Sequence, residues 1–443
     1  MIDVVEERLS QTDALLHTTP ITCFNRARAH ASRFQVPENP PQGFLYGLPV
    51  LIKDAEAVEG VRFTEGSLIY ASRIPEKSSA LVTQLEARGA IVVGKTNVPE
   101  FCAGSQSFNS LFPTTVSPWD TRTTAGGSSG GSCSAVAACQ GWLATGSDLG
   151  GSLRTPAAFC GVVGFRVSPG RVPRDGSHGW DFAPPALNPG ETFEAAAIAG
   201  NEQGATVRVG FSTLGYKYNP AVEELCRKAA DLLASGAGAK VQDISSDIDF
   251  GKAEDLFLIL RGNTFEQKYA AFLQDTNKKQ LMKPEVIWNA SIASTLGLAK
   301  KTHEAESNLR KQFEQVQELF RSMDILCVPA TLDAAFDAEV RYPAEQLGQT
   351  FSNYLGWMMP ACIVTTFLCP ALVMPCGFLE DGRPVGLQLV AAYGEDAALL
   401  RAAAALEKLL GLPQGCPEPR RGTVELNTKG PWSAEDAARH HGL

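Results

Sequence analysis

The first clear pattern in the chain is a change from helical to strand-like spacing of apolar residues. Apolar positions at helical spacing predict a helix that is capped by Ser78 and Ser79 and ended by Gly89. The apolar run 90–93 then predicts a short buried strand. This order of elements is typical of proteins in which helices and strands alternate.

The same alternation returns in the second half of the chain. Pro220 opens a predicted helix, and 302–322 has the apolar spacing of a longer amphipathic helix. The run 325–328 follows it as a strand. Such alternation implies a parallel or mixed sheet covered by helices on both faces. No linker or repeat separates the two halves, so we expect a single domain over 1–443.

One long segment has the apolar character of a membrane span. No charged residue lies between Glu345 and Glu380, and 357–378 is the most apolar part. This part contains three prolines, and each would leave backbone hydrogen bonds unmade in a helix exposed to lipid. We therefore expect short buried strands and turns here, and no membrane association.

Composition narrows the classes of partner. The chain has 443 residues, 44% of them hydrophobic, which is enough apolar material for a large core. Its 39 Lys and Arg stand against 48 Asp and Glu, a net charge of −9, without a basic run. This charge argues against nucleic acid or an anionic membrane surface as the main partner.

The cysteines and the N-terminus indicate a compartment. The 11 cysteines are scattered, and Cys133, Cys139 and Cys160 lie among small apolar residues as expected for buried free thiols. The first residues are acidic and lack the apolar core of a secretory signal. We expect a reducing cytoplasm.

The stretch 89–96 matches a phosphate-binding Walker A loop letter for letter. Such a loop is irregular, follows a strand and opens a helix. Here a predicted helix precedes the motif and its middle residues form the predicted strand, so the pattern disfavours nucleotide binding.

A second glycine motif, 127–131, has the form G-x-S-x-G with Ser129 in the place of a hydrolase nucleophile. That nucleophile needs a preceding strand and a histidine, whereas 118–124 does not resemble a buried strand. None of the six histidines lies in a setting that suggests catalysis; they are His17, His30, His178, His303, His440 and His441. An esterase with Ser129 and a histidine therefore stays the weaker alternative.

The third glycine-rich stretch extends from 126 to 171. Two serine- and glycine-rich loops, 126–132 and 145–154, are joined by a run of small residues with helical character. Such loops can bring backbone N–H groups and hydroxyls to one point, and apolar segments of this kind do not interrupt flexible linkers.

This stretch resembles the signature sequence of the amidase signature family of serine hydrolases. Further segments resemble the family's other blocks in the same order, namely 47–54, 89–101, 324–329 and 370–388. The resemblance implies one large α/β/α domain around a twisted mixed β-sheet covered by helices on both faces. Its signature core covers roughly 47–171, and 205–443 completes the sheet and the pocket.

The resemblance also implies a triad of a serine, a second serine preceded by a cis peptide bond, and a lysine. The nucleophile maps to Ser152, the bridging serine to Ser128 and the base to Lys53. The donors of the oxyanion hole map to the backbone N–H groups of four consecutive residues, Leu149, Gly150, Gly151 and Ser152. Neither a metal nor a cofactor is implied.

This chemistry is coherent on physical grounds. A serine hydroxyl needs a base to attack an amide, and a solvated lysine is protonated at neutral pH. Burial lowers the pKa of a lysine, and Lys53 follows the apolar run 48–52. We expect Asp148, Arg154 and Ser129 to support the loops.

By analogy, the three residues that follow Glu100 are expected to line the substrate site: Phe101, Cys102 and Ala103. Ser147 stands where the family often has threonine. The segment 175–204 is shorter than the family's usual block, which predicts a differently shaped site entrance. The family's amidotransferase subunit keeps the longer block, so that identity is less expected.

These observations predict an amidohydrolase that cleaves a linear carboxamide, of small or aryl type and including anilide or urea-type bonds. The expected binding partner is a small-molecule amide substrate. Whether the chain also forms a homodimer stays an open question. Two alternatives remain: the Ser129 esterase and an amidotransferase A-like subunit that requires partner chains.

Overall fold

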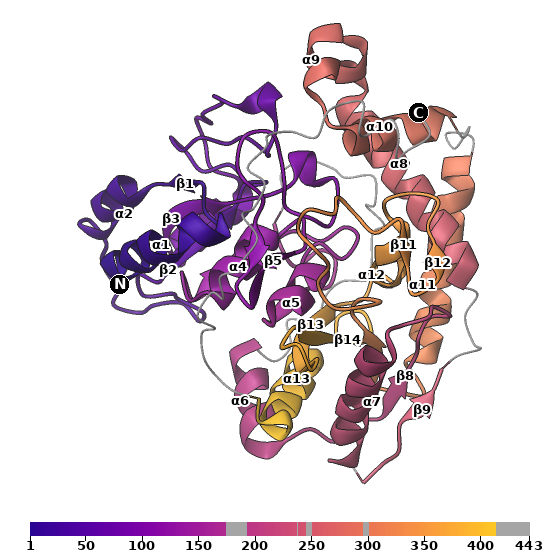
Figure 1. The fold of residues 1–443 in the computed structure, drawn as a ribbon. Helices are drawn as coiled ribbons and strands as arrows, with labels where there is room; N and C mark the ends of the chain where they lie inside the picture. Colours follow the sequence, from indigo (N-terminus) through magenta and orange to yellow (C-terminus); the bar gives the residue numbers. More distant parts are fainter. Residues whose placement is uncertain (174–192, 237, 245–249, 296–300, 413–443) are drawn as a thin grey trace.

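The computed structural model describes residues 1–173, 193–236, 238–244, 250–295 and 301–412 (Figure 1). The helices are α1 (Ile2–Leu16), α2 (Phe24–Ala31), η1 (Leu68–Tyr70), α3 (Ala80–Ala87), η2 (Glu100–Cys102), α4 (Gly130–Ala137), α5 (Arg154–Cys160), α6 (Phe193–Gln203), α7 (Pro220–Ser235), α8 (Phe250–Gln274), α9 (Thr276–Leu281), α10 (Pro284–Thr295), α11 (Thr302–Leu319), η4 (Gly356–Met358), α12 (Met359–Thr366) and α13 (Asp396–Leu410). The strands are β1 (Ile21–Thr22), β2 (Pro49–Lys53), β3 (Ile91–Thr96), β4 (Val116–Ser117), β5 (Asp120–Thr124), β6 (Leu143–Ala144), β7 (Gly164–Arg166), β8 (Val209–Phe211), β9 (Gln242–Asp243), β10 (Ile325–Pro329), β11 (Glu345–Gln346), β12 (Gln349–Thr350), β13 (Ala371–Phe378) and β14 (Pro384–Val390).

The elements predicted from apolar spacing are confirmed. Helix α7 begins at Pro220, where the Asn219 side chain accepts a hydrogen bond from the N–H of Ala221 at 3.0 Å. Helix α3 and strand β3 occupy the predicted positions around Gly89, as do α11 and β10 later in the chain. Helix α11 ends at Leu319, three residues before the predicted end at 322.

The smaller of the two main sheets has the strand order β1-β3-β2-β6. Strand β2 runs parallel to both β3 and β6, so the carboxyl ends of these three strands lie at the same edge. Alternate residues of β2 face opposite sides. Val50 and Ile52 pack with α3, whereas Leu51 packs with α1 and α2.

The larger sheet has the order β7-β13-β14-β10-β8-β9 and mixes parallel with antiparallel pairs. The odd residues of β10, Ile325 and Cys327, pack against α7 and α13. The even residues, Leu326 and Val328, pack on the other face against α8, α11 and α12. Figure 1 shows α7 and α13 together on one side of these strands.

The predicted class, a mixed α/β fold with helices on both faces, is therefore confirmed. The strands are divided between two main sheets instead of forming one. The part of the predicted short segment 175–204 that is described contains α6, and 175–192 lies outside the described residues.

Two local predictions were wrong. The segment 357–378 holds η4 and the helix α12 before β13, because the fully buried α12 satisfies its own backbone hydrogen bonds in the core. Cys139 is exposed, since it lies two residues beyond the end of α4 and has a positive φ of 55°. Cys133 and Cys160 are buried as predicted. Among the described residues, every helix is too short or too polar to span a lipid bilayer.

Candidate active site

Lys53 is the last residue of β2 and lies at the edge where the parallel strands of the smaller sheet end. Its backbone N–H donates to Thr145 Oγ1 at 2.9 Å, which ties β2 to the loop that follows β6. The sheet edge therefore places a lysine beside the glycine-rich stretch 126–171. The carboxyl ends of parallel strands are a common place for binding sites in α/β proteins.

The amine of Lys53 is surrounded by hydroxyl groups. Its Nζ donates to the side-chain oxygens of Ser128 at 2.7 Å, Ser129 at 2.8 Å and Ser147 at 2.8 Å. Two of these partners come from the first glycine-rich loop and one from the second. Lys53 thus contacts both loops. The contact with Ser128 was predicted from the sequence, and the contact with Ser147 was not.

Burial controls the charge of this amine. The Lys53 side chain is 0% exposed, and desolvation lowers its pKa from the ordinary value, opposed by weaker attractions that include Asp148. The adjacent carboxylate, Asp54, forms its ion pair with Lys95 at 2.6 Å and also accepts from the hydroxyl of Thr64. The neutral form of Lys53 is therefore favoured relative to a lysine in water.

Lys95 itself belongs to the Walker-like stretch 89–96. It is buried in β3, and its ammonium also lies 4.6 Å from the centre of the Phe63 ring. Because Lys95 is held inside a strand by Asp54, it does not point into a phosphate-binding loop.

Ser128 is held by close backbone packing. The Gly127–Ser128 peptide bond is cis. A Cβ atom at Gly127 would lie 2.9 Å from the backbone nitrogen of Gln106, and one at Gly131 would lie 2.4 Å from that of Asn97. Glycine is needed at both positions because the loop passes directly over other backbone segments. Ser128 and Ser129 are fully buried at the start of α4.

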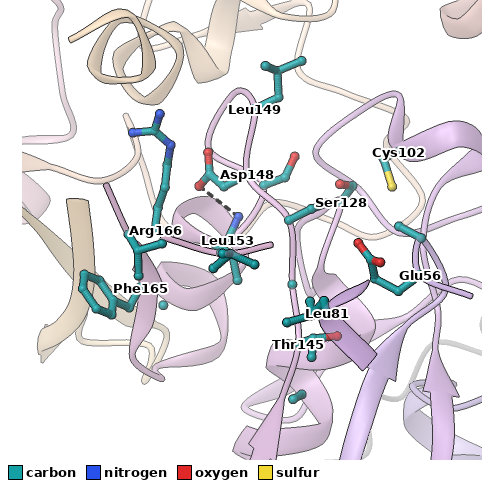
Figure 2. A pocket seen from close by; sticks show the side chains of 18 of the residues that line it. Glu56, Leu81, Cys102, Ser128, Thr145, Asp148, Leu149, Leu153, Phe165 and Arg166 are labelled. Atoms are coloured by element: carbon teal, nitrogen blue, oxygen red, sulfur yellow. Dashed lines mark hydrogen bonds between the residues drawn. The ribbon is translucent and has the colours of Figure 1, made fainter. Parts of the chain in front are cut away.

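The loop that carries Ser152 is organised by a buried ion pair. Asp148 and Arg154 meet at 2.8 Å, and their side chains are 1% and 0% exposed. Arg154 also donates to Gln388 Oε1 on β14 and Thr365 Oγ1 on α12, so it anchors the loop to the larger sheet. The Asp148 carboxylate accepts from the backbone N–H of Leu153, as marked in Figure 2. Burial alone would raise the pKa of Asp148, but Arg154, together with the backbone N–H of Gly151, holds it well below its usual range.

One of the four predicted oxyanion-hole donors is already engaged. The N–H of Gly151 donates to Asp148 Oδ1 at 2.8 Å. Gly151 has a φ of +95°, and a Cβ there would lie 2.5 Å from that of Ala361. Within the described residues, the N–H groups of Leu149, Gly150 and Ser152 have no hydrogen-bond acceptor. These three groups are the better candidates to bind an oxyanion.

Ser128 and Ser152 line the same cavity, whose volume is about 1470 Å³. Figure 2 shows Ser128, Cys102 and Leu149 around one part of it. Ser152 is 8% exposed, and its carbonyl oxygen accepts from the N–H of Ser129 at 3.0 Å. Within the described residues the Ser152 hydroxyl forms no hydrogen bond, so it is available to a ligand.

Of the three residues predicted to line the substrate site, two border this cavity. Phe101 and Cys102, in η2, line the cavity, and both have positive φ angles of 50° and 56°. Ala103 is fully buried within an aromatic cluster and is not a lining residue of the cavity.

The alternative nucleophile, Ser129, has no histidine partner among the described residues. Its hydroxyl accepts from Lys53 and donates to the carbonyl of Ser147 at 3.3 Å. His17 lies against the carbonyl of Thr114, His30 lies beside Glu86, and His303 is on the surface. His178, His440 and His441 lie outside the described residues.

Sequence reasoning missed one wall of the cavity. Helix α8 contributes lining residues from a single face: Arg261, Thr264, Phe265, Lys268 and Tyr269. Their spacing of three and four residues was the available signal, but it also fits ordinary core packing.

Replacing Asp148 with asparagine should destabilise the protein strongly. The change leaves the guanidinium of Arg154 buried without its counter-ion, which costs about 3–5 kcal/mol in other buried pairs. Urea denaturation should show this loss in the free energy of unfolding. Asp120→Asn is the matched control, because the pair between Asp120 and Arg122 lies at the surface with the arginine 56% exposed. Equal stability of the two variants would contradict a supporting role for Asp148.

Comparisons with known proteins show to which family the chain belongs. The sequence matches the Amidase family over residues 2–184 and 177–400. The chain is 31% identical to the A-type subunit of the glutamyl-tRNA(Gln) amidotransferase of Acaryochloris marina, over 91% of this chain and 92% of the relative. The corresponding protein of Anaeromyxobacter dehalogenans is 30% identical over 95% of this chain and 94% of its own.

Solved structures share the fold. A bacterial aryl acylamidase of the amidase signature enzymes superposes with a TM-score of 0.82 at 20% identity, over 92% of both chains. A chain from an inhibitor-bound complex related to an s-triazine catabolic enzyme has a TM-score of 0.79 at 26% identity, over 95% of this chain and 96% of that one. The protein described here therefore belongs to the amidase signature family.

Proposed function

We propose that the protein is an amidase that hydrolyses a carboxamide to a carboxylic acid and an amine. The family comprises enzymes that act on C–N bonds, by hydrolysis or by amide transfer. The observation that carries the proposal is the contact between the buried amine of Lys53 and the hydroxyl of Ser128 at 2.7 Å, in a cavity that also reaches Ser152.

In the first step Ser152 Oγ attacks the carbonyl carbon of the amide. The proton of Ser152 passes to Ser128 Oγ, while the proton of Ser128 passes to the neutral amine of Lys53. The distance of 2.7 Å between Lys53 Nζ and Ser128 Oγ suits this transfer. The hydroxyl of Ser152 must turn toward Ser128 when substrate binds, as hydrogen bonds in free active sites often tighten only in the complex.

The negative charge then gathers on the carbonyl oxygen. The N–H groups of Leu149, Gly150 and Ser152 are the proposed donors to this oxyanion, and Gly151 positions them through its bond to Asp148. Loss of one such donor typically costs about 10²–10³ in rate.

In the second step the C–N bond breaks. The ammonium of Lys53 returns a proton through Ser128 to the leaving nitrogen, which departs as the amine. Water then attacks the acyl ester on Ser152, giving up a proton along the same path. The carboxylic acid leaves, and the hydroxyl of Ser152 is restored.

A panel of simple amides and esters tests this function on the purified chain alone. We expect release of amine from amides and labelling of the protein by a fluorophosphonate that reacts with activated serines. A chain that neither cleaves any amide nor takes up the label would not fit the proposal.

A second candidate function is that of an amidotransferase subunit, favoured by the relatives at 30–31% identity over most of their length. This role predicts activity only in the presence of partner chains. For the amidase and for the amidotransferase subunit alike, we predict a cytoplasmic enzyme that needs no cofactor. Whether the chain forms a homodimer stays open in both cases.

A further inference from the structure

One wall of the cavity is a face of helix α8 that carries cationic and aromatic side chains, and these side chains restrict which substrates fit. We call this face the α8 wall; its residues are Arg261, Thr264, Phe265, Lys268 and Tyr269. Residues at positions i, i+3, i+4 and i+7 lie on one face of a helix, and this face lines the same cavity as Ser128 and Ser152. Arg261 is buried at one end of the wall, and Lys268 is exposed at the other. The wall therefore leads from the interior to solvent.

Aromatic rings form the middle of the wall. The ring centres of Phe101 and Tyr269 are 4.4 Å apart with an angle of 30°, and those of Phe265 and Tyr269 are 5.5 Å apart. All three residues line the cavity, and each is less than 10% exposed. The planes of Phe265 and Tyr269 are inclined by 55°, so these rings offer a further ring an angled apolar surface for edge-to-face or offset packing.

The cations around the cavity differ in their partners. Arg261 donates to Asn289 at 2.7 Å and Tyr354 at 3.0 Å, and its guanidinium lies 4.6 Å from the centre of the Phe265 ring. Arg166 and Lys408, which also line the cavity, donate to backbone carbonyl oxygens. These three cations are engaged by the protein itself.

Lys268 is different. Within the described part of the chain its ammonium has no hydrogen bond and no ion pair. The lining carboxylate whose charge acts on Lys268, Glu65, forms its ion pair with Arg73 at 2.7 Å. Burial raises the pKa of the Glu65 carboxyl, against the attractions of Arg73 and Lys268. The cavity lining as a whole contains four acidic residues, Glu56 among them, and four basic residues. Within the described residues, Lys268 adds to the solvent end of the wall an ammonium that no hydrogen bond or ion pair engages.

We propose that the α8 wall selects an aryl amide with an anionic substituent, whose ring packs against Phe101, Phe265 and Tyr269 while its anion faces Lys268. The inference rests on the proposed amidase function and names its substrate class. An aromatic carboxylate matches both features, because its ring and its charge are held at a fixed separation. A substrate with an aliphatic chain would use the apolar surface but not the ammonium.

Two matched pairs of compounds test the charge. Benzamide is compared with 4-carbamoylbenzoate, and acetanilide with 4-acetamidobenzoate, so that the ring is on the acyl side or on the amine side. In the pair whose ring occupies the wall, we expect about a fivefold higher kcat/KM for the carboxylate at low salt, the upper range for an exposed ion pair. The advantage should shrink as salt is added.

Variants assign the effect to the wall. Lys268→Met should lower the kcat/KM of the carboxylate about fivefold relative to that of the neutral compound, which abolishes the advantage of the carboxylate. Lys278→Met is the matched control, since Lys278 is exposed over the ring of Phe272 but does not line the cavity. Phe265→Leu should raise KM for aryl amides about threefold to tenfold relative to hexanamide. Phe272→Leu, in the same aromatic cluster but outside the lining, should not.

The outcomes separate this inference from the proposed function. Equal rates within both pairs, or an advantage that survives Lys268→Met, overturn the selection of an anionic aryl group while amide hydrolysis still stands. If the chain hydrolyses no amide, the amidase proposal fails. Calorimetric binding of the same compounds to the wild type and to Lys268→Met then decides the inference.

Discussion

Ser152→Ala is expected to lower the rate of amide hydrolysis by on the order of 10⁴-fold or more and to abolish labelling by a fluorophosphonate. Ser152 lines the cavity, and removal of its hydroxyl leaves no oxygen to form the acyl ester. Binding should persist, because the cavity wall and the N–H groups of the loop are unchanged. Rates of amine release and mass spectrometry of the labelled chain provide the two readouts.

Ser129→Ala and Ser235→Ala are the comparisons for this variant. Ser129 contacts Lys53 without being the predicted nucleophile, so its variant should keep the covalent label even where its rate falls. Ser235 lies exposed at the end of α7, and its variant should behave as the wild type. A label that survives in Ser152→Ala and disappears in Ser129→Ala would reverse the assignment of the nucleophile.

Lys53→Met is expected to lower kcat/KM for amides by about 10²–10⁴-fold, the usual contribution of a general base. In the wild type, log kcat/KM should rise with pH, because only the neutral amine accepts a proton. The rise should level off below about pH 10.4, the ordinary pKa of a lysine, because burial lowers the pKa of Lys53. The variant should lose this pH-dependent rise.

The pH profile separates a base from a structural lysine. Methionine has a similar length and fills the same buried space, and thermal unfolding shows whether Lys53→Met keeps its fold. A folded variant that keeps the wild-type rise with pH would show that another group is the base. Lys217→Met serves as control, because Lys217 lies on the surface near Gln349.

Much of the fold could be predicted from the order of local patterns. The helix that ends before Gly89, the strand β3 and the helix that begins at Pro220 follow from apolar spacing and from capping residues. These signals are local, since each depends on residues within a few turns of one another. The mixed α/β class follows from the order of such segments along the chain, whereas the family follows from the resemblance of the motif-bearing segments to the family's blocks.

Other features depend on contacts that no local pattern encodes. The apolar run 357–378 fits a strand, a buried helix or a turn equally well, and only packing in the core selected α12. Cys139 lies among small residues in the sequence, yet the end of α4 turns it outward.

The sequence by itself, through its resemblance to the family, determined three candidate catalytic residues: Lys53 at the end of an apolar run, and Ser128 and Ser152 in the two glycine-rich loops. Only the tertiary structure decided how they are surrounded. Lys53 meets Ser147, 94 residues away, and the N–H of Gly151 is taken by Asp148. The α8 wall reaches the same cavity from the second half of the chain. The reason is physical: residue type and spacing set the local backbone and the available chemistry, whereas burial, charge state and free donors depend on which distant segments pack together.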